Sequence, residues 1–166
     1  MHLSTQTIVG LTGNILVMPR SFDPATPLRA VVFVVALVVL LVAHQVGDHV
    51  IQTDHQAAGK AGSGVAALWA MLGHLAGYHA MAGVLLVATF AVLGLPLTWL
   101  GVLAGLAFSA LTHAALDRRW PVRAILRGLR SPQFAETTGP VCGLYAADQA
   151  LHQLALLGSA LLFAGL

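Results

Sequence analysis

Four long runs of apolar residues dominate the sequence, separated by short links that are polar, glycine-rich or interrupted by proline. The runs cover residues 28–51, 65–95, 97–116 and 141–166. Each supplies about the 20 mostly apolar residues that an α-helix needs to cross the hydrocarbon core of a bilayer. The pattern therefore predicts an all-α fold, an integral membrane bundle of four transmembrane helices.

Small residues four positions apart within these runs predict close contacts between helices. The two pairs are Gly73 with Gly77 and Gly101 with Gly105. Helices in lipid associate through such residues because their backbones then approach closely. The link after the third run adds residues 122–129, which we expect to form a short amphipathic helix on the membrane surface.

The beginning of the chain differs from the rest. Residues 8–18 are apolar but are broken by Gly10, Gly13 and Asn14, and they are too few to cross a bilayer comfortably. We therefore expect an interfacial or irregular segment at residues 1–27, followed by a transmembrane domain at residues 28–166. A fifth, N-terminal span is the alternative.

The basic residues predict the orientation of the bundle. Successive spans cross in opposite directions, so the links at residues 52–64 and 118–140 share one side of the membrane. They contain six of the eight Lys and Arg residues, whereas Arg20 and Arg29 lie on the other side. Cytoplasmic loops carry an excess of positive charge. We expect a multi-pass protein of the bacterial inner (plasma) membrane with both links in the cytoplasm.

Composition agrees with a membrane protein and excludes several other classes. The chain is 58% hydrophobic and 8% charged, whereas soluble domains carry about 25% charged residues. The net charge of +2 is small, and the arginines cluster in one link, so we expect the lipid bilayer as partner and no nucleic acid. A single cysteine excludes an intramolecular disulfide. The oligomeric state stays open, a homo-oligomer included.

Histidine and aspartate residues recur in pairs four positions apart near the ends of three runs. Residues separated by four positions lie one turn apart on the same face of a helix. The second run adds a histidine three turns from its start, so all four helices bring such groups to a similar depth. These residues are His44 and Asp48, His74, His113 and Asp117, and Asp148 and His152.

Carboxylates at this depth require partners, because an ionised group in the bilayer costs on the order of 3 kcal/mol. Few cations lie in the runs, so a bound metal is the expected source of positive charge. Mixed histidine and carboxylate ligands suit Zn, Mn or Fe as one or two divalent ions. We predict metal ligation by His44, Asp48, His74, His113, Asp117, Asp148 and His152, and catalytic roles for Asp48, Asp117 and Asp148.

Further polar residues flank these pairs. Gln52, Lys60 and Gln149 are candidates for binding a substrate, although Lys60 reads most simply as a solvated loop charge. His49 and His79 lie off the shared helix faces, and we expect them to support the site or the structure.

The motifs resemble those of a family of small bacterial and phage integral membrane proteins of unknown function. The resemblance covers roughly residues 36 to 156. It rests on His44-x-x-x-Asp48-x-x-x-Gln52-Thr53-Asp54 with Lys60, on His74, on His113-x-x-x-Asp117, and on Asp148-Gln149-x-x-His152. The family commonly has an aromatic residue where this chain has His49. The pattern is also similar to that of membrane proteins assigned as metal-dependent hydrolases.

The residues favour one function over three others. The leading hypothesis is a metal-dependent hydrolase whose site lies near the cytoplasmic face and acts on a lipid-like or phosphorylated substrate. An ion- or proton-coupled transporter would use the His and Asp residues as a relay. A haem-binding bundle would use paired histidines. In a non-enzymatic scaffold, the polar layer, meaning the paired His and Asp residues and His74 at a common depth, would only hold the helices together.

Overall fold

The computed structural model describes residues 25–166, and the predicted N-terminal segment, apart from its last three residues, lies outside this range. All regular secondary structure in the described part is helical, so the all-α prediction is confirmed. The elements are α1 (Thr26–Val46), the π-helical turn η1 (Gly47–Ile51), α2 (Asp54–Gly59), α3 (Gly64–Leu93), α4 (Trp99–Leu116), α5 (Trp120–Gly128), the 3₁₀ turn η2 (Pro132–Glu136) and α6 (Gly143–Gly165).

Within residues 25–166, three segments are long and apolar enough to cross a membrane. They are Thr26–Ile51, Gly64–Leu93 and Trp99–Leu116, and they match the first three predicted spans to within two residues at each end. Helix α6 (Gly143–Gly165) occupies the fourth predicted span but is less apolar than the others. A membrane protein with at least three apolar helices is therefore supported, and the crossing of α6 stays a prediction.

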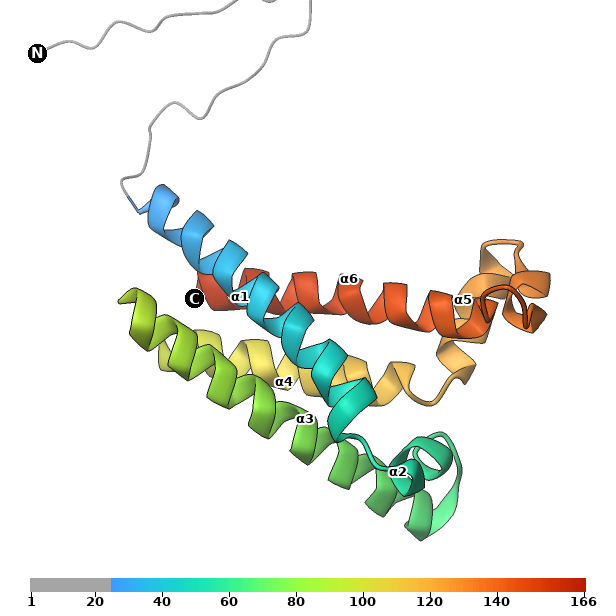
Figure 1. Ribbon diagram of the computed structural model, residues 1–166. Coiled ribbons are helices and arrows are strands. Elements are labelled where there is room, and N and C mark those ends of the chain that lie inside the picture. The colour runs from blue at the N-terminus through green and yellow to red at the C-terminus, as the bar shows by residue number, and fades with distance from the viewer. Residues whose placement is uncertain (1–24) are drawn as a thin grey trace, which may run out of the picture.

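The four long helices lie side by side, and α6 packs extensively against both α4 and α1 (Figure 1). The short elements α2, α5 and η2 gather at one end of these helices. There Arg118 Nη1 donates a hydrogen bond of 2.8 Å to the carbonyl oxygen of Gly62, which joins the two polar links. The prediction that both links share one side of the bundle agrees with this arrangement.

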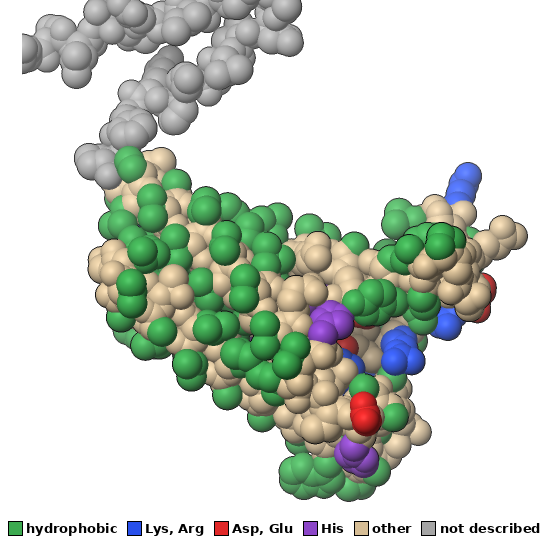
Figure 2. Space-filling model, viewed as in Figure 1, with side chains coloured by type: hydrophobic (Ala, Val, Ile, Leu, Met, Phe, Trp, Pro, Cys, Tyr) green, Lys and Arg blue, Asp and Glu red, His purple; other side chains and the backbone are tan. Residues whose placement is uncertain are grey.

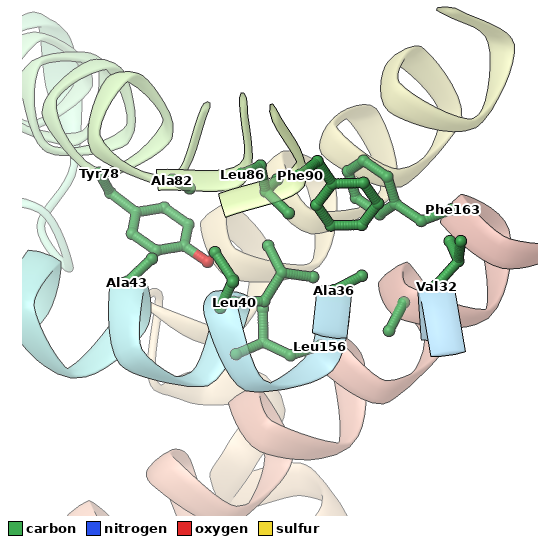
Figure 3. Packing of buried hydrophobic residues seen from close by; sticks show 12 residues of the cluster. Val32, Ala36, Leu40, Ala43, Tyr78, Ala82, Leu86, Phe90, Leu156 and Phe163 are labelled. Carbon is green, nitrogen blue, oxygen red and sulfur yellow. The ribbon is translucent and has the colours of Figure 1, made fainter. Parts of the chain in front are cut away.

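The apolar core lies away from that polar end, where α1, α3 and α6 meet (Figure 3). Buried residues recur every three or four positions along each helix, so each helix presents one face to its neighbours. The faces consist of Val32, Ala36, Leu40 and Ala43 in α1, Tyr78, Ala82, Leu86 and Phe90 in α3, and Leu156, Ala160 and Phe163 in α6. The opposite face of α1 exposes Val34, Val38 and Val42, as lipid-facing positions do.

One of the two predicted small-residue pairs mediates a contact between long helices. A Cβ atom on Gly105 would clash with the Phe163 ring, and one on Gly101 would lie 3.1 Å from the Phe163 carbonyl oxygen. These glycines therefore let α4 approach α6. Gly73 and Gly77 of α3 instead face Gln56 of α2 and Ile51 of η1, so this pair packs against the helical segments that follow α1.

The amphipathic helix expected at residues 122–129 is α5. Its Val122 and Leu126 are buried against Ala135 of η2, whereas Arg127 is exposed and Arg123 forms an ion pair with Glu136 of η2. Arg119 precedes α5 with a φ of 63°. Non-glycine residues rarely adopt this left-handed conformation, which turns the chain sharply between α4 and α5.

Candidate metal centre

His44 and Asp48 lie where the helix geometry changes at the end of the first long helix. Helix α1 ends at Val46 and continues as the π-helical turn η1, which contains Asp48. Such turns are rare and occur frequently at functional sites. Gly47 lies so close to α3 that a Cβ atom there would be 2.6 Å from Cδ2 of Tyr78. The glycine therefore lets this turn sit directly against α3.

Asp48, His74 and His113 bring three potential ligand atoms together. Nε2 of His74 lies 2.8 Å from Nε2 of His113 and 3.3 Å from Oδ1 of Asp48, and that oxygen lies 3.4 Å from Nε2 of His113. Zinc–nitrogen bonds are about 2.0–2.1 Å long, so two ligand atoms in a tetrahedral zinc site lie roughly 3.3 Å apart. The triangle thus has about the size of one face of a zinc coordination tetrahedron.

Asp117, the residue that follows α4, joins the same two histidines. Its Oδ2 lies 3.3 Å from Nε2 of both His74 and His113. Its Oδ1 forms an ion pair of 2.8 Å with Nζ of Lys60. Burial raises the pKa of the Asp117 carboxyl group, but hydrogen bonds from His113 and His74 and the charge of Lys60 outweigh burial and hold the pKa below its ordinary value. These contacts favour the ionised form of the Asp117 carboxylate.

Lys60 corrects a sequence-based expectation. Lys60 is the C-cap residue that follows α2 and is buried, with a side chain only 9% exposed, so it is not a solvated loop charge. Its Nζ also lies 3.1 Å from Nε2 of His74. The polar layer thus contains one lysine cation of its own, which sequence patterning assigned to solvent.

The surroundings of His74 suit a bound metal ion. Its Nε2 lies within 3.3 Å of Lys60, His113, Asp48 and Asp117. One imidazole nitrogen either donates or accepts a single hydrogen bond. Four close polar neighbours therefore exceed what this atom satisfies by hydrogen bonding, whereas a metal ion between them would satisfy several at once.

The remaining predicted ligands lie beside this group. Ring nitrogens of His44 and His152 lie within 4.8 Å of a ring nitrogen of His113. Nε2 of His152 lies 4.0 Å from Oδ1 of Asp117, and its Nδ1 lies 3.5 Å from Oδ2 of Asp148. The structure thus brings together residues from all four long helices, as their common depth in the sequence predicts.

Two histidines stay outside the centre and have partners of their own. Nδ1 of His49 lies 3.0 Å from the carbonyl oxygen of Gln45, so it donates there, and Nε2 accepts a hydrogen bond of 2.6 Å from the Tyr145 hydroxyl group. His79 contacts the carbonyl oxygen of Leu75 at 2.8 Å and Oγ of Ser109 at 3.3 Å. Both therefore have hydrogen-bond partners outside the triangle, and their supporting or structural role stays a prediction.

A cavity of about 350 Å³ opens onto the centre. Asp48, Lys60 and Asp117 form part of its wall, so a small molecule in it would reach the buried carboxylates. The three predicted substrate-binding residues also line it, namely Gln52, Lys60 and Gln149. Figure 2 shows charged side chains and histidines concentrated at this end of the molecule, while hydrophobic side chains cover the remainder of that face.

Sequence reasoning did not single out several residues of the cavity wall, among them Arg119, Cys142 and Tyr145. Arg119 was one of several arginines in its link, and Cys142 was a lone cysteine in an apolar run. Their position depends on the sharp turn before α5 and on where α6 begins. The spacing of residues in the sequence contains no signal for either feature.

One comparison with known proteins identifies a relationship. The model of a family described as "Protein of unknown function (DUF3307)" matches residues 36–164. The matched segment includes every predicted site residue. Comparisons with curated proteins and with solved structures give no match.

Proposed function

Since the chain belongs to the DUF3307 family of proteins of unknown function, we propose its function from the site alone: a membrane hydrolase that uses a divalent metal ion. The observation that carries the proposal is the buried triangle of Asp48, His74 and His113, with Asp117 against both histidines. Mixed nitrogen and oxygen donors suit Zn, Mn or Fe.

The proposal includes a setting in the membrane. Helix α6 completes a four-helix bundle, since it packs between α1 and α4 and carries His152 and Asp148 to the same layer as the other helices. The arginine-rich link favours the cytoplasmic side of the bacterial inner membrane for the polar end. A substrate would then enter the cavity from the cytoplasmic interface.

Cavity chemistry favours a lipid-like substrate with a phosphate group. Lys60 and Arg119 supply positive charge, and Gln52 and Gln149 supply amide groups beside it. Arg119 forms no ion pair with any residue from 25 to 166, so its guanidinium group is available to an anion. A second, largely apolar groove of about 700 Å³ runs between α3 and α4, with His79 at its wall, and suits an acyl chain.

The carboxylates of the cavity and a bound metal ion together suit the hydrolysis of an ester. A divalent ion would polarise a phosphoryl or carbonyl oxygen and lower the pKa of a bound water. Oδ1 of Asp148 is buried and has no hydrogen-bond partner among residues 25–166, and the residue lines the cavity. We assign it as general base. It takes a proton from water as the water oxygen adds to phosphorus, the ester P–O bond breaks, and Asp148 returns the proton to the departing alkoxide.

Metal content tests the proposal directly. Protein purified in detergent without chelators should contain at least one divalent ion per chain by mass spectrometry. His74→Ala and His113→Ala should lose it, because each removes a corner of the triangle. His79→Ala is the matched control: it removes another partly buried imidazole of α3 that lies outside the triangle, and it should retain the metal. Metal-free wild-type protein after add-back would sink the proposal.

Activity tests the assignment of the base. Asp148→Asn should retain the metal yet lose at least tenfold in hydrolysis of a phosphate ester lipid, since its amide accepts no proton. Asp54→Asn, which changes an exposed carboxylate outside the cavity, should leave turnover unchanged. Loss of metal in Asp148→Asn would assign this residue to the coordination shell.

One observation favours a second candidate, a proton relay. Nζ of Lys60, Nε2 of His74 and Nε2 of His113 form a run of contacts of 3.1 and 2.8 Å that needs no metal. The apolar halves of α3 and α6 beyond this run oppose a continuous path. Proton flux in liposomes, together with absence of metal, would favour the relay.

A further inference from the structure

Three buried histidines form a second group, which shares only His113 with the triangle of Asp48, His74 and His113. His44, His113 and His152 offer ring nitrogens within 4.8 Å of one another. The ring centroids of His44 and His152 are 4.9 Å apart, and those of His113 and His152 are 4.5 Å apart. The three come from α1, α4 and α6, so the group forms only when these helices pack together.

Four of the six ring nitrogens of this group have no hydrogen-bond partner among residues 25–166. Both nitrogens of His44 are among them, although its side chain is 0% exposed. Nε2 of His152 also has none, with its side chain 2% exposed. Buried polar atoms are almost always satisfied, and a true exception calls for an unobserved water or ion. In a bilayer the demand is stricter, because no solvent reaches the group.

Asp48 connects this group to the triangle. Its Oδ1 faces Nε2 of His74 at 3.3 Å and Nε2 of His113 at 3.4 Å. Its Oδ2 lies on the side of His44, 3.5 Å from Nε2 of that residue. The two oxygens of one carboxylate are thus directed at two separate sets of imidazole nitrogens, as they are when a carboxylate bridges two ions.

We propose that the polar layer holds two divalent ions, the second one held by His44 and His152 and bridged to the first by Asp48. This inference rests on the proposed metal centre and deepens it. Helix bundles build paired sites from carboxylates and histidines on facing helices. Two ions about 3.5–4 Å apart stabilise both the attacking and the leaving oxygen of an in-line displacement, which suits a phosphate ester.

Lys60 explains why the two sites would differ. Its ammonium group pairs with Oδ1 of Asp117, on the side of His74. The pair of His44 and His152 has no lysine or arginine ion-paired to it among residues 25–166. One lysine cation thus already lies beside the first site, whereas at the second site only protonated imidazoles or a bound ion would supply positive charge.

The experiment uses the full chain in detergent, loaded with Mn²⁺ alone after chelation. Wild-type protein should bind two Mn²⁺ per chain, and its electron paramagnetic resonance spectrum should show exchange coupling between them. His44→Ala and His152→Ala should each bind one ion with an uncoupled spectrum. His79→Ala, outside both sites, should match the wild type.

Each outcome separates the inference from the proposed function. One uncoupled ion in the wild type, unchanged in His44→Ala and His152→Ala, overturns the second site and leaves the first. Two uncoupled ions overturn bridging by Asp48. No bound ion overturns both the inference and the proposed metal centre. Since the wild-type spectrum alone distinguishes these results, an alanine variant that fails to fold does not remove the test.

Discussion

At the scale of single residues, Lys60 decides the electrostatics of the polar layer. It places an ammonium group 2.8 Å from a carboxylate that is 4% exposed. Removing one partner of such a buried pair is far more damaging than removing a surface pair, because the other charge is left without compensation. The same residue gives the layer a cation whether or not a metal is bound.

Lys60→Met should therefore destabilise chelator-treated protein by about 3–5 kcal/mol. Arg123→Met is the matched control, since it breaks the ion pair of Arg123 with Glu136, whose side chains are 40% and 70% exposed. Such an exposed pair contributes at most about 1 kcal/mol. Unfolding of both variants in detergent measures the difference. Equal losses would mean that Lys60 and Asp117 are hydrated rather than buried together.

Metal loading offers a second test of Lys60. A divalent ion beside Asp117 compensates part of the charge that the lysine otherwise balances. Adding Mn²⁺ should therefore recover part of the stability lost in Lys60→Met, and it should recover none in Arg123→Met. Thermal unfolding with and without the ion checks this. No difference between the two variants would argue against an ion near Asp117.

At the scale of elements, the contact between α4 and α6 positions two of the histidines. His113 lies in the last turn of α4 and His152 lies in α6, so their separation depends on how closely these helices approach. Gly105 permits that approach, since its missing side chain leaves room for the Phe163 ring. Ser159 adds a hydrogen bond to the Gly105 carbonyl oxygen. The glycine therefore acts on the site at a distance of two helical turns.

Gly105→Ala should destabilise the protein by about 1–3 kcal/mol, because the added methyl group overpacks the contact. Gly83→Ala in α3 is the control: nothing lies within 4 Å of its added Cβ atom, so replacing a mid-helix glycine should stabilise by at most about 1 kcal/mol. Phe163→Leu should restore stability to Gly105→Ala by making room. Thermal unfolding of the single and double variants checks this, and no recovery in the double variant would contradict it.

At the scale of the whole molecule, polar and apolar residues are separated along the helices. The polar links, the cavity and the His and Asp residues lie toward one end, and the apolar core lies toward the other (Figures 2 and 3). This polarity gives the protein two chemically different membrane faces. The proposed orientation, with the polar end in the cytoplasm, can be tested with the protein's own cysteine.

Cys142 is the single cysteine of the chain, and it is exposed at the polar end. A membrane-impermeant maleimide should label it in inside-out vesicles and not in right-side-out vesicles, because the positive-inside rule assigns this end to the cytoplasm. Leu166→Cys in a Cys142→Ala background places the thiol at the opposite end of α6 and should give the reverse pattern if α6 spans the membrane. Labelling of both positions from one side would show that α6 does not span.

The sequence by itself determined the helical class, three apolar segments with their boundaries, and the His and Asp residues that gather in one layer. These features follow from apolar run length and from the four-residue spacing, which are local properties of a helix. His44 and Asp48, for example, remain neighbours although a π-helical turn replaces the expected α-helix.

Tertiary structure alone decided which of these His and Asp residues lie close enough to bind the same ion. It also decided which other residues contact them. Lys60 is 14 residues from His74 and 57 from Asp117 in the chain, so no local pattern predicts their contact. Arg119 reaches the cavity wall because its own left-handed backbone conformation makes the sharp turn between α4 and α5. The physical reason is the same in each case: spacing fixes the face of one helix, whereas contacts between segments depend on how several helices and links pack.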